Sequence, residues 1–75
     1  MTLTVKLIGP LIQALGFSEK AIYFAAVPTP DAVLKTIAFP ADRPRIITRN
    51  GRAVRPDESL AEGDRIVISP LYSGG

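Results

Sequence analysis

The residues best suited to chemistry are the last five, Leu71-Tyr72-Ser73-Gly74-Gly75. The two glycines have no side chains, so they fit a narrow channel and can approach a ligand closely. An α-carboxyl has a pKa of about 3.5, so the Gly75 carboxylate is ionised at neutral pH. Five extended residues reach roughly 16–18 Å, which is enough to enter a partner's active site. We therefore predict a flexible tail, residues 71–75, with Gly75 as its reactive end; a frayed end or a cloning remnant is the alternative.

The rest of the chain provides no conventional catalytic group. There is no histidine and no cysteine, so Ser73 has no base to activate it and no Cys/His metal site can form. P-loop motifs are also missing.

Five arginines lie in one short stretch, although the net charge is only +2: Arg43, Arg45, Arg49, Arg52 and Arg55. Clustered positive charge can bind nucleic acid. Against this, Asp42, Asp57 and Glu58 interleave with the arginines, and no aromatic residue is present there to stack on bases. Nucleic acid is therefore not an expected partner. The remaining interpretations are a solvated strand face, or docking of Arg49 and Arg52 onto an acidic patch of an enzyme.

The elements that must position the tail follow from hydrophobic periodicity. Alternation over residues 2–8 predicts a strand with one buried face, and 20–27, 45–49, 53–54 and 65–69 read as further strands. Residues 10–16 predict a short helical turn with glycine past its end. A second helix is expected over 29–38, because Thr29-Pro30-Asp31 is a start signal and Pro40 a stop signal.

Two further features fix the topology. Asn50-Gly51 predicts a tight hairpin, because a type I′ turn needs positive φ at both central residues. The near-continuous apolar run at 65–69 predicts a central strand with neighbours on both sides. One helix on a mixed sheet of four to five strands is an α+β arrangement, with a domain over 1–70 and the tail over 71–75. No apolar stretch of membrane-spanning length and no signal segment is present, so we expect a cytoplasmic protein.

Three segments of the chain resemble the family of small sulfur carriers that includes the molybdopterin synthase small subunit (MoaD) and the thiamine-pathway carrier (ThiS). They are Asn50-Gly51-Arg52 with Val54, the run from Leu60 to Ile68 around Gly63-Asp64, and the ending from Ser69 to Gly75. The segment from Gly9 to Gly16 is more similar to the molybdopterin branch. The resemblance spans nearly the whole chain, but only its last third is specific.

The resemblance implies a β-grasp, ubiquitin-like fold and a defined reaction. An adenylyltransferase related to ubiquitin-activating enzymes would use ATP to adenylate Gly75, and a persulfide donor would convert the adenylate into a thiocarboxylate. Gly74, Ser73 and Tyr72 would enter the partner's channel, and Leu71 and Pro70, with Arg49 and Arg52, would dock on the partner. The protein would then be a carrier or a small synthase subunit rather than an enzyme, with no permanently bound cofactor and with the large synthase subunit as a further partner.

Two departures keep the pathway open. Tyr72 stands where the molybdopterin carriers often have valine, and Ser69 replaces the first of their two prolines. Tyr72 could lie in the partner's channel or fold back on the sheet, and Leu71 could belong to a partner-binding patch or close the edge of the core. The first hypothesis is a sulfur carrier in molybdopterin synthesis, with thiamine, tRNA or amino-acid pathways as alternatives. The others are a ubiquitin-like modifier that forms isopeptide bonds and, last, an RNA-binding β-grasp domain.

Overall fold

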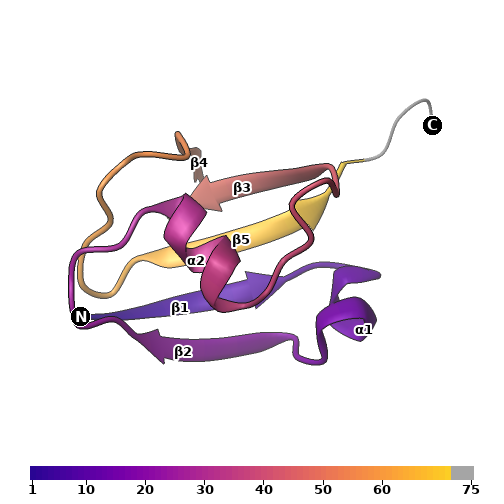
Figure 1. The fold of residues 1–75 in the computed structure, drawn as a ribbon, viewed down its shortest axis with the longest axis horizontal. Helices are drawn as coiled ribbons and strands as arrows, with labels where there is room; N and C mark the ends of the chain where they lie inside the picture. The colour runs from indigo at the N-terminus through magenta and orange to yellow at the C-terminus, as the bar shows by residue number, and fades with distance from the viewer. Residues whose placement is uncertain (72–75) are drawn as a thin grey trace.

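The computed structural model describes residues 1–71 and shows five strands in one sheet, with a main helix against one face (Figure 1). In chain order the elements are β1 (Thr2–Leu7), α1 (Leu11–Leu15), β2 (Glu19–Tyr23), α2 (Pro30–Thr36), β3 (Arg45–Arg49), β4 (Arg52–Ala53) and β5 (Arg65–Pro70). The strands lie side by side in the order β2-β1-β5-β3-β4. The predicted α+β class is therefore confirmed.

Strand β5 lies at the centre of the sheet, as the apolar run predicted. It pairs in parallel with β1 on one side and antiparallel with β3 on the other. Ile66 and Ile68 on β5 are fully buried, which is worth about 1.5–3 kcal/mol for each side chain. The segment that leads to the tail is thus held from both sides and from beneath.

The core lies between the sheet and α2. In β1, exposure alternates residue by residue, so Leu3, Val5 and Leu7 point toward α2 and the intervening side chains point to the open face. The buried apolar residues form one cluster: Leu3, Val5, Leu7, Leu11, Val33, Leu34, Phe39, Leu60, Ile66 and Ile68. Within the described part of the chain, no buried side-chain nitrogen or oxygen lacks a hydrogen-bond partner.

The predicted Asn50-Gly51 hairpin is present. Asn50 has φ 51° and Gly51 has φ 83°, the two positive values that the turn requires. The return strand β4 is Arg52–Ala53, one residue earlier than predicted. The predicted turn before β2 is also present as α1, which ends at Gly16 in the left-handed conformation with φ 86°.

Helix α2 ends two residues earlier than the sequence predicted, and Pro40 is not what ends it. Ala38 adopts φ 57°, its N–H bonds to the Lys35 carbonyl at 3.1 Å, and the Phe39 N–H bonds to the Leu34 carbonyl at 2.9 Å. This pair of bonds is the Schellman motif, and it buries Phe39 beside the last helical turn. Ala38 therefore lies outside the helix instead of on its apolar stripe.

Strand β2 also ends earlier than the predicted residue 27. The last bonds of its ladder join Phe24 to Met1, at 2.7 and 2.9 Å. Residues 25–27 belong to no strand, and Val27 is 59% exposed. An apolar residue alone does not extend a strand that has no neighbour.

Candidate functional site

The structure places the base of the tail at the end of the central strand. Pro70, the last residue of β5, is half-buried and pairs with Arg45 of β3. Leu71 follows it and is 53% exposed, so it does not close the core. Tyr72, Ser73, Gly74 and Gly75 lie outside the described residues, and the predictions made for them stay predictions.

An apolar patch surrounds this point on the open face of the sheet. Ile46 of β3 pairs with Ser69, and the Ile8 N–H bonds to the Ile68 carbonyl at 3.0 Å. Ile8, Ser69 and Ile46 therefore form a row at the ends of β1, β5 and β3, and Leu71 follows in the chain two residues after Ser69. Ile8, Ile46 and Leu71 are 37%, 47% and 53% exposed. We call these three residues the root patch.

Sequence reasoning found only one member of the root patch. Leu71 was predicted as a docking residue, whereas Ile8 and Ile46 were missed. The signal was present at Ile46-Ile47, because two consecutive isoleucines in a strand that has one face on the core must place one of them on the solvent face. Pro70 was also predicted as a docking residue, and it precedes Leu71 in sequence. By the alternation along β5, however, its side chain lies on the same side of the sheet as Ile66 and Ile68.

At the other end of β5 a buried carboxylate joins three segments. The Asp64 carboxylate is almost fully buried, and it accepts hydrogen bonds from the Ala61 N–H at 2.7 Å and the Asn50 side-chain amide at 2.9 Å. It also pairs with the Arg49 Nε at 2.7 Å. The Asn50 side-chain oxygen in turn accepts a hydrogen bond from the Arg65 backbone N–H at 2.8 Å. We call this set the Asp64 cluster; it fastens the β3–β4 hairpin to the start of β5.

Electrostatics in the Asp64 cluster favour the charged forms. Burial by itself would raise the pKa of the Asp64 carboxyl, but the Ala61 and Asn50 hydrogen bonds and the Arg49 charge together lower it below its usual value. The hydrogen bond from Arg49 to Glu58, with the nearby Asp64 charge, raises the pKa of the Arg49 guanidinium against the effect of burial. Both groups are therefore charged at neutral pH.

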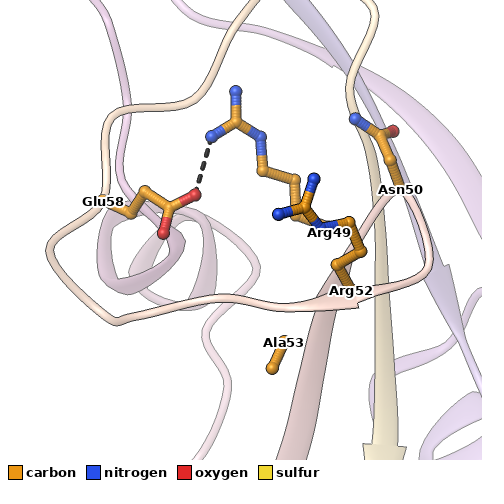
Figure 2. A pocket seen from close by; sticks show the side chains of 5 residues that line it. All are labelled: Arg49, Asn50, Arg52, Ala53 and Glu58. Atoms are coloured by element: carbon orange, nitrogen blue, oxygen red, sulfur yellow. Dashed lines mark hydrogen bonds and ion pairs between the residues drawn. The ribbon is translucent and has the colours of Figure 1, made fainter.

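Arg49, a predicted docking residue, is occupied within the fold. Its Nη1 bonds to Glu58 Oε2 at 2.8 Å and to the Ser59 carbonyl at 3.1 Å, in addition to the contact with Asp64. Figure 2 shows the Glu58 carboxylate directed at the Arg49 guanidinium, to which it is bonded. These two side chains and Arg52 are among the residues that line a pocket of about 400 Å³. Arg52 is exposed and makes no ion pair with residues 1–71. Of the two arginines, only Arg49 is held by ion pairs within the described part of the chain.

The predicted docking residues do not form one surface. Arg49 pairs with Ile66 at the beginning of β5, whereas Pro70 and Leu71 lie at its end. Four residues of strand separate the two groups by about 13 Å. The structure therefore brings Leu71 together with Ile8 and Ile46, and keeps Arg49 and Arg52 apart from them.

Residues 1–71 contain neither a metal-binding group nor a membrane-spanning helix. Among residues 1–71, His, Cys, Asp and Glu form no group of three or more that could hold a metal ion. None of the helices in this part of the chain has the length and apolar character needed to cross a membrane.

Comparison with known proteins gives both a family and a set of similar folds. The model of the ThiS family matches residues 5–75. A sequence search of curated proteins found no match. The solved structure of small archaeal modifier protein 1 from Haloferax volcanii superposes with a TM-score of 0.80 at 20% identity, over 95% of this chain and 98% of that one.

Two further similar structures are of molybdopterin converting factor subunits. A Pyrococcus furiosus protein assigned as molybdopterin converting factor subunit 1 gives a TM-score of 0.84 at 22% identity, over 96% of this chain and 99% of that one. The solved complex of subunits 1 and 2 of molybdopterin-converting factor from Helicobacter pylori contains a chain that superposes with a TM-score of 0.69 at 17% identity, over the full length of both chains. With identities this low the structures establish the fold, and the predicted ubiquitin-like β-grasp architecture is confirmed.

Proposed function

The chain belongs to the ThiS family, and we propose on that basis that it is a sulfur carrier whose Gly75 carboxylate is converted to a thiocarboxylate. The protein itself would supply no catalytic side chain. It would serve as a co-substrate that is recognised through its folded domain while a partner acts on its last residue. The partners would be an adenylyltransferase that uses ATP and a persulfide donor, in the cytoplasm.

The proposed steps need nothing from the chain beyond its terminus. A Gly75 carboxylate oxygen attacks the α-phosphorus of ATP, pyrophosphate leaves, and an acyl-adenylate forms. The terminal sulfur of the persulfide then attacks the carbonyl carbon, and AMP leaves with its bonding electron pair. A thiol reduces the resulting acyl disulfide, which leaves the thiocarboxylate on Gly75 and a disulfide on the donor.

Family membership carries the proposal, and the structural observation that supports it is the root patch at the base of the tail. Exposed apolar side chains beside the last strand residue form a surface on which a partner can dock. Because β5 is held by β1 and β3, a partner seated on Ile46 and Leu71 would find the tail leaving from a fixed point. Fixing the origin of a short chain raises the effective concentration of its end in the partner's active site.

We further propose that the sulfur goes to molybdopterin. The support is the similarity in fold to molybdopterin converting factor subunit 1, together with the segment from Gly9 to Gly16, which the structure forms as α1 and its flanking turns. The large synthase subunit would then be a third partner, docking on the same root patch. Tyr72 would have to fit in its channel.

Intact-mass spectrometry tests the carrier proposal. The full chain is incubated with its activating enzyme, ATP and a persulfide donor, and we expect the mass increase of one oxygen-to-sulfur exchange at Gly75. A chain that lacks Gly75 is the matched control and should remain unchanged. If the activating enzyme releases pyrophosphate with another carrier but the intact chain keeps its original mass, the proposal is wrong.

A second candidate is a protein modifier, favoured by the similarity in fold to small archaeal modifier protein 1. In that case the Gly75 carbonyl would be passed to a lysine amine and form an isopeptide bond. Peptide mass spectrometry of proteins from the native host distinguishes the two functions. Branched peptides that carry the tail on lysine support the modifier, whereas a thiocarboxylate without branched peptides supports the carrier.

A further inference from the structure

The outer edge of β2 carries backbone groups that point away from the sheet. Leu7 donates to the Ser18 carbonyl, and Met1 and Phe24 bond to each other, so these pairs mark the two ends of the β1–β2 ladder. Bonded and non-bonded pairs alternate along antiparallel strands. By the observed register, Lys20 and Ile22 direct their N–H and C=O groups toward β1.

The intervening residues Glu19, Ala21 and Tyr23 therefore direct their backbone N–H and C=O groups outward. No strand covers that edge within residues 1–71, and none of these groups has a backbone partner in that part of the chain. A row of unpaired donors and acceptors with strand spacing is complementary to another extended chain.

A groove runs beside this edge, on the face of the sheet that carries α2. Its volume is about 530 Å³, and Phe17, Ile22 and Ile37 supply apolar, half-buried walls. Ile22 is opposite Leu3 in the register, which places its side chain on the α2 side. Side chains of an added strand alternate between faces, so every second one would enter the groove.

The positive charge of Lys20 indicates which kind of chain can bind in the groove. Lys20 is the one charged residue among the described residues that line the groove, and its Nζ lies 4.6 Å from the centre of the Phe17 ring. It makes no ion pair with residues 1–71. A second copy of this chain, paired antiparallel about Ala21, would place its Ile22 opposite Lys20 and supply no acid there. A carboxylate on the incoming segment would give Lys20 a partner.

We propose that β2 binds an extended segment of another protein as an added strand at the edge of the sheet. The segment has apolar side chains at alternate positions, which enter the groove, and an aspartate or glutamate beside Lys20. Backbone hydrogen bonds to Glu19, Ala21 and Tyr23 hold it, and the groove and Lys20 select its sequence. The proposal does not depend on the chemistry of the tail.

The groove lies on the α2 side of the sheet, whereas the root patch lies on the open face. Two strand spacings of about 4.8 Å lie between β2 and β5, and β5 rather than β2 leads to Leu71. A protein bound at β2 would therefore leave the end of β5 accessible. One partner can hold the domain while a second one receives the tail.

The test is an NMR titration of the full chain with a synthetic peptide of alternating valine and serine that carries aspartate at one end. We expect shifts of the β2 amides, and slower hydrogen exchange at the Ala21 and Tyr23 N–H groups, since both become hydrogen-bonded. Ala21→Pro removes an outward donor and no bond to β1, so it should retain the fold and weaken binding about tenfold. Thermal unfolding checks that the variant is folded.

A charge reversal provides the matched control. Lys20→Glu should weaken binding of the aspartate peptide and strengthen binding of a peptide in which lysine replaces the aspartate. No exchange protection at Ala21 and Tyr23 at the highest soluble peptide concentration overturns the proposal. The proposal is also overturned if the Ala21→Pro variant is folded and binds the peptide as tightly as the parent protein. Exchange protection that is confined to the root patch would overturn it as well. Dimerisation that Ala21→Pro abolishes, in place of peptide binding, would make a second copy the occupant and also overturn it.

Discussion

Asp64→Ala should be the most damaging single substitution in the hairpin region. The Asp64 carboxylate accepts the Ala61 N–H at 2.7 Å and the Asn50 amide at 2.9 Å, and it pairs with Arg49 at 2.7 Å. Alanine removes all three contacts from a nearly inaccessible place. The Ala61 N–H then has no acceptor, and the hairpin loses its link to the start of β5.

The size of the effect follows from these contacts. An unpaired buried donor costs about 1–3 kcal/mol, and a hydrogen bond to a charged group contributes about 1.5–3 kcal/mol. The two energies should not simply be added, because Arg49 keeps its bond to Glu58 and is therefore not left without a partner. We take about 3 kcal/mol as the loss in the free energy of unfolding. A domain of this size has a net stability of about 3–5 kcal/mol, so most of it would be lost.

Thermal unfolding followed by circular dichroism measures this loss. About 3 kcal/mol corresponds to a fall in Tm of roughly 12–24 °C for a domain of this length. The matched control is Asp57→Ala, because the Asp57 side chain is 87% exposed and its contact with Arg55 is 3.9 Å long. That control should change the free energy of unfolding by less than about 0.5 kcal/mol. Equal Tm values for the two variants would refute the assignment of a structural role to Asp64.

The pH dependence checks the same reasoning independently. The pKa of Asp64 is lower in the folded protein than in the unfolded chain, where it is about 3.9. Its contribution is therefore complete above that value and is lost as the pH falls through the lower, folded pKa. Asp64→Asn should have a shallower loss of stability below about pH 4 than the parent protein. An identical acid limb in urea unfolding would show that Asp64 is not the group responsible.

Three other substitutions test separate parts of the structure. Thr29→Ala removes the cap on the Ala32 N–H at 3.2 Å and should lower the free energy of unfolding by about 1 kcal/mol in urea denaturation. Ala38→Gly should raise it by about 0.5–1 kcal/mol in the same assay, because Ala38 has φ 57°; a decrease would contradict the strain argument. Ile46→Asp should weaken binding of the activating enzyme by about tenfold or more in calorimetry with little change in Tm, since Ile46 is 47% exposed.

Most of the fold could be predicted because local signals and burial agree along the chain. The alternation in residues 2–8, the Asn50-Gly51 turn and the β-branched run at 65–69 each have one physical interpretation, and the structure confirms all three. The end of α2 could not be predicted in the same way. The left-handed cap falls on Ala38, a residue type without preference for positive φ, and burial of Phe39 is what stabilises it.

The candidate site was only partly predictable because it combines residues that meet through the sheet. Ile8, Ile46 and Leu71 are far apart in sequence and come together only when β5 lies between β1 and β3. The role of Arg49 was hidden for the same reason. A cluster of arginines suggests a surface for partners, but Glu58 and Asp64, nine and fifteen residues further along the chain, reach Arg49 only when the chain is folded.

The two ends of β5 divide the work of the domain. At its beginning the Asp64 cluster holds the hairpin with charged groups that have their partners inside the fold. At its end the exposed side chains of the root patch leave apolar surface uncovered, which adds nothing to the stability of the isolated chain. A marginally stable domain can keep exposed apolar surface only if other parts of the fold, such as the Asp64 cluster, supply the free energy of folding. This separation explains why Asp64→Ala and Ile46→Asp should have opposite profiles, one in unfolding and the other in binding.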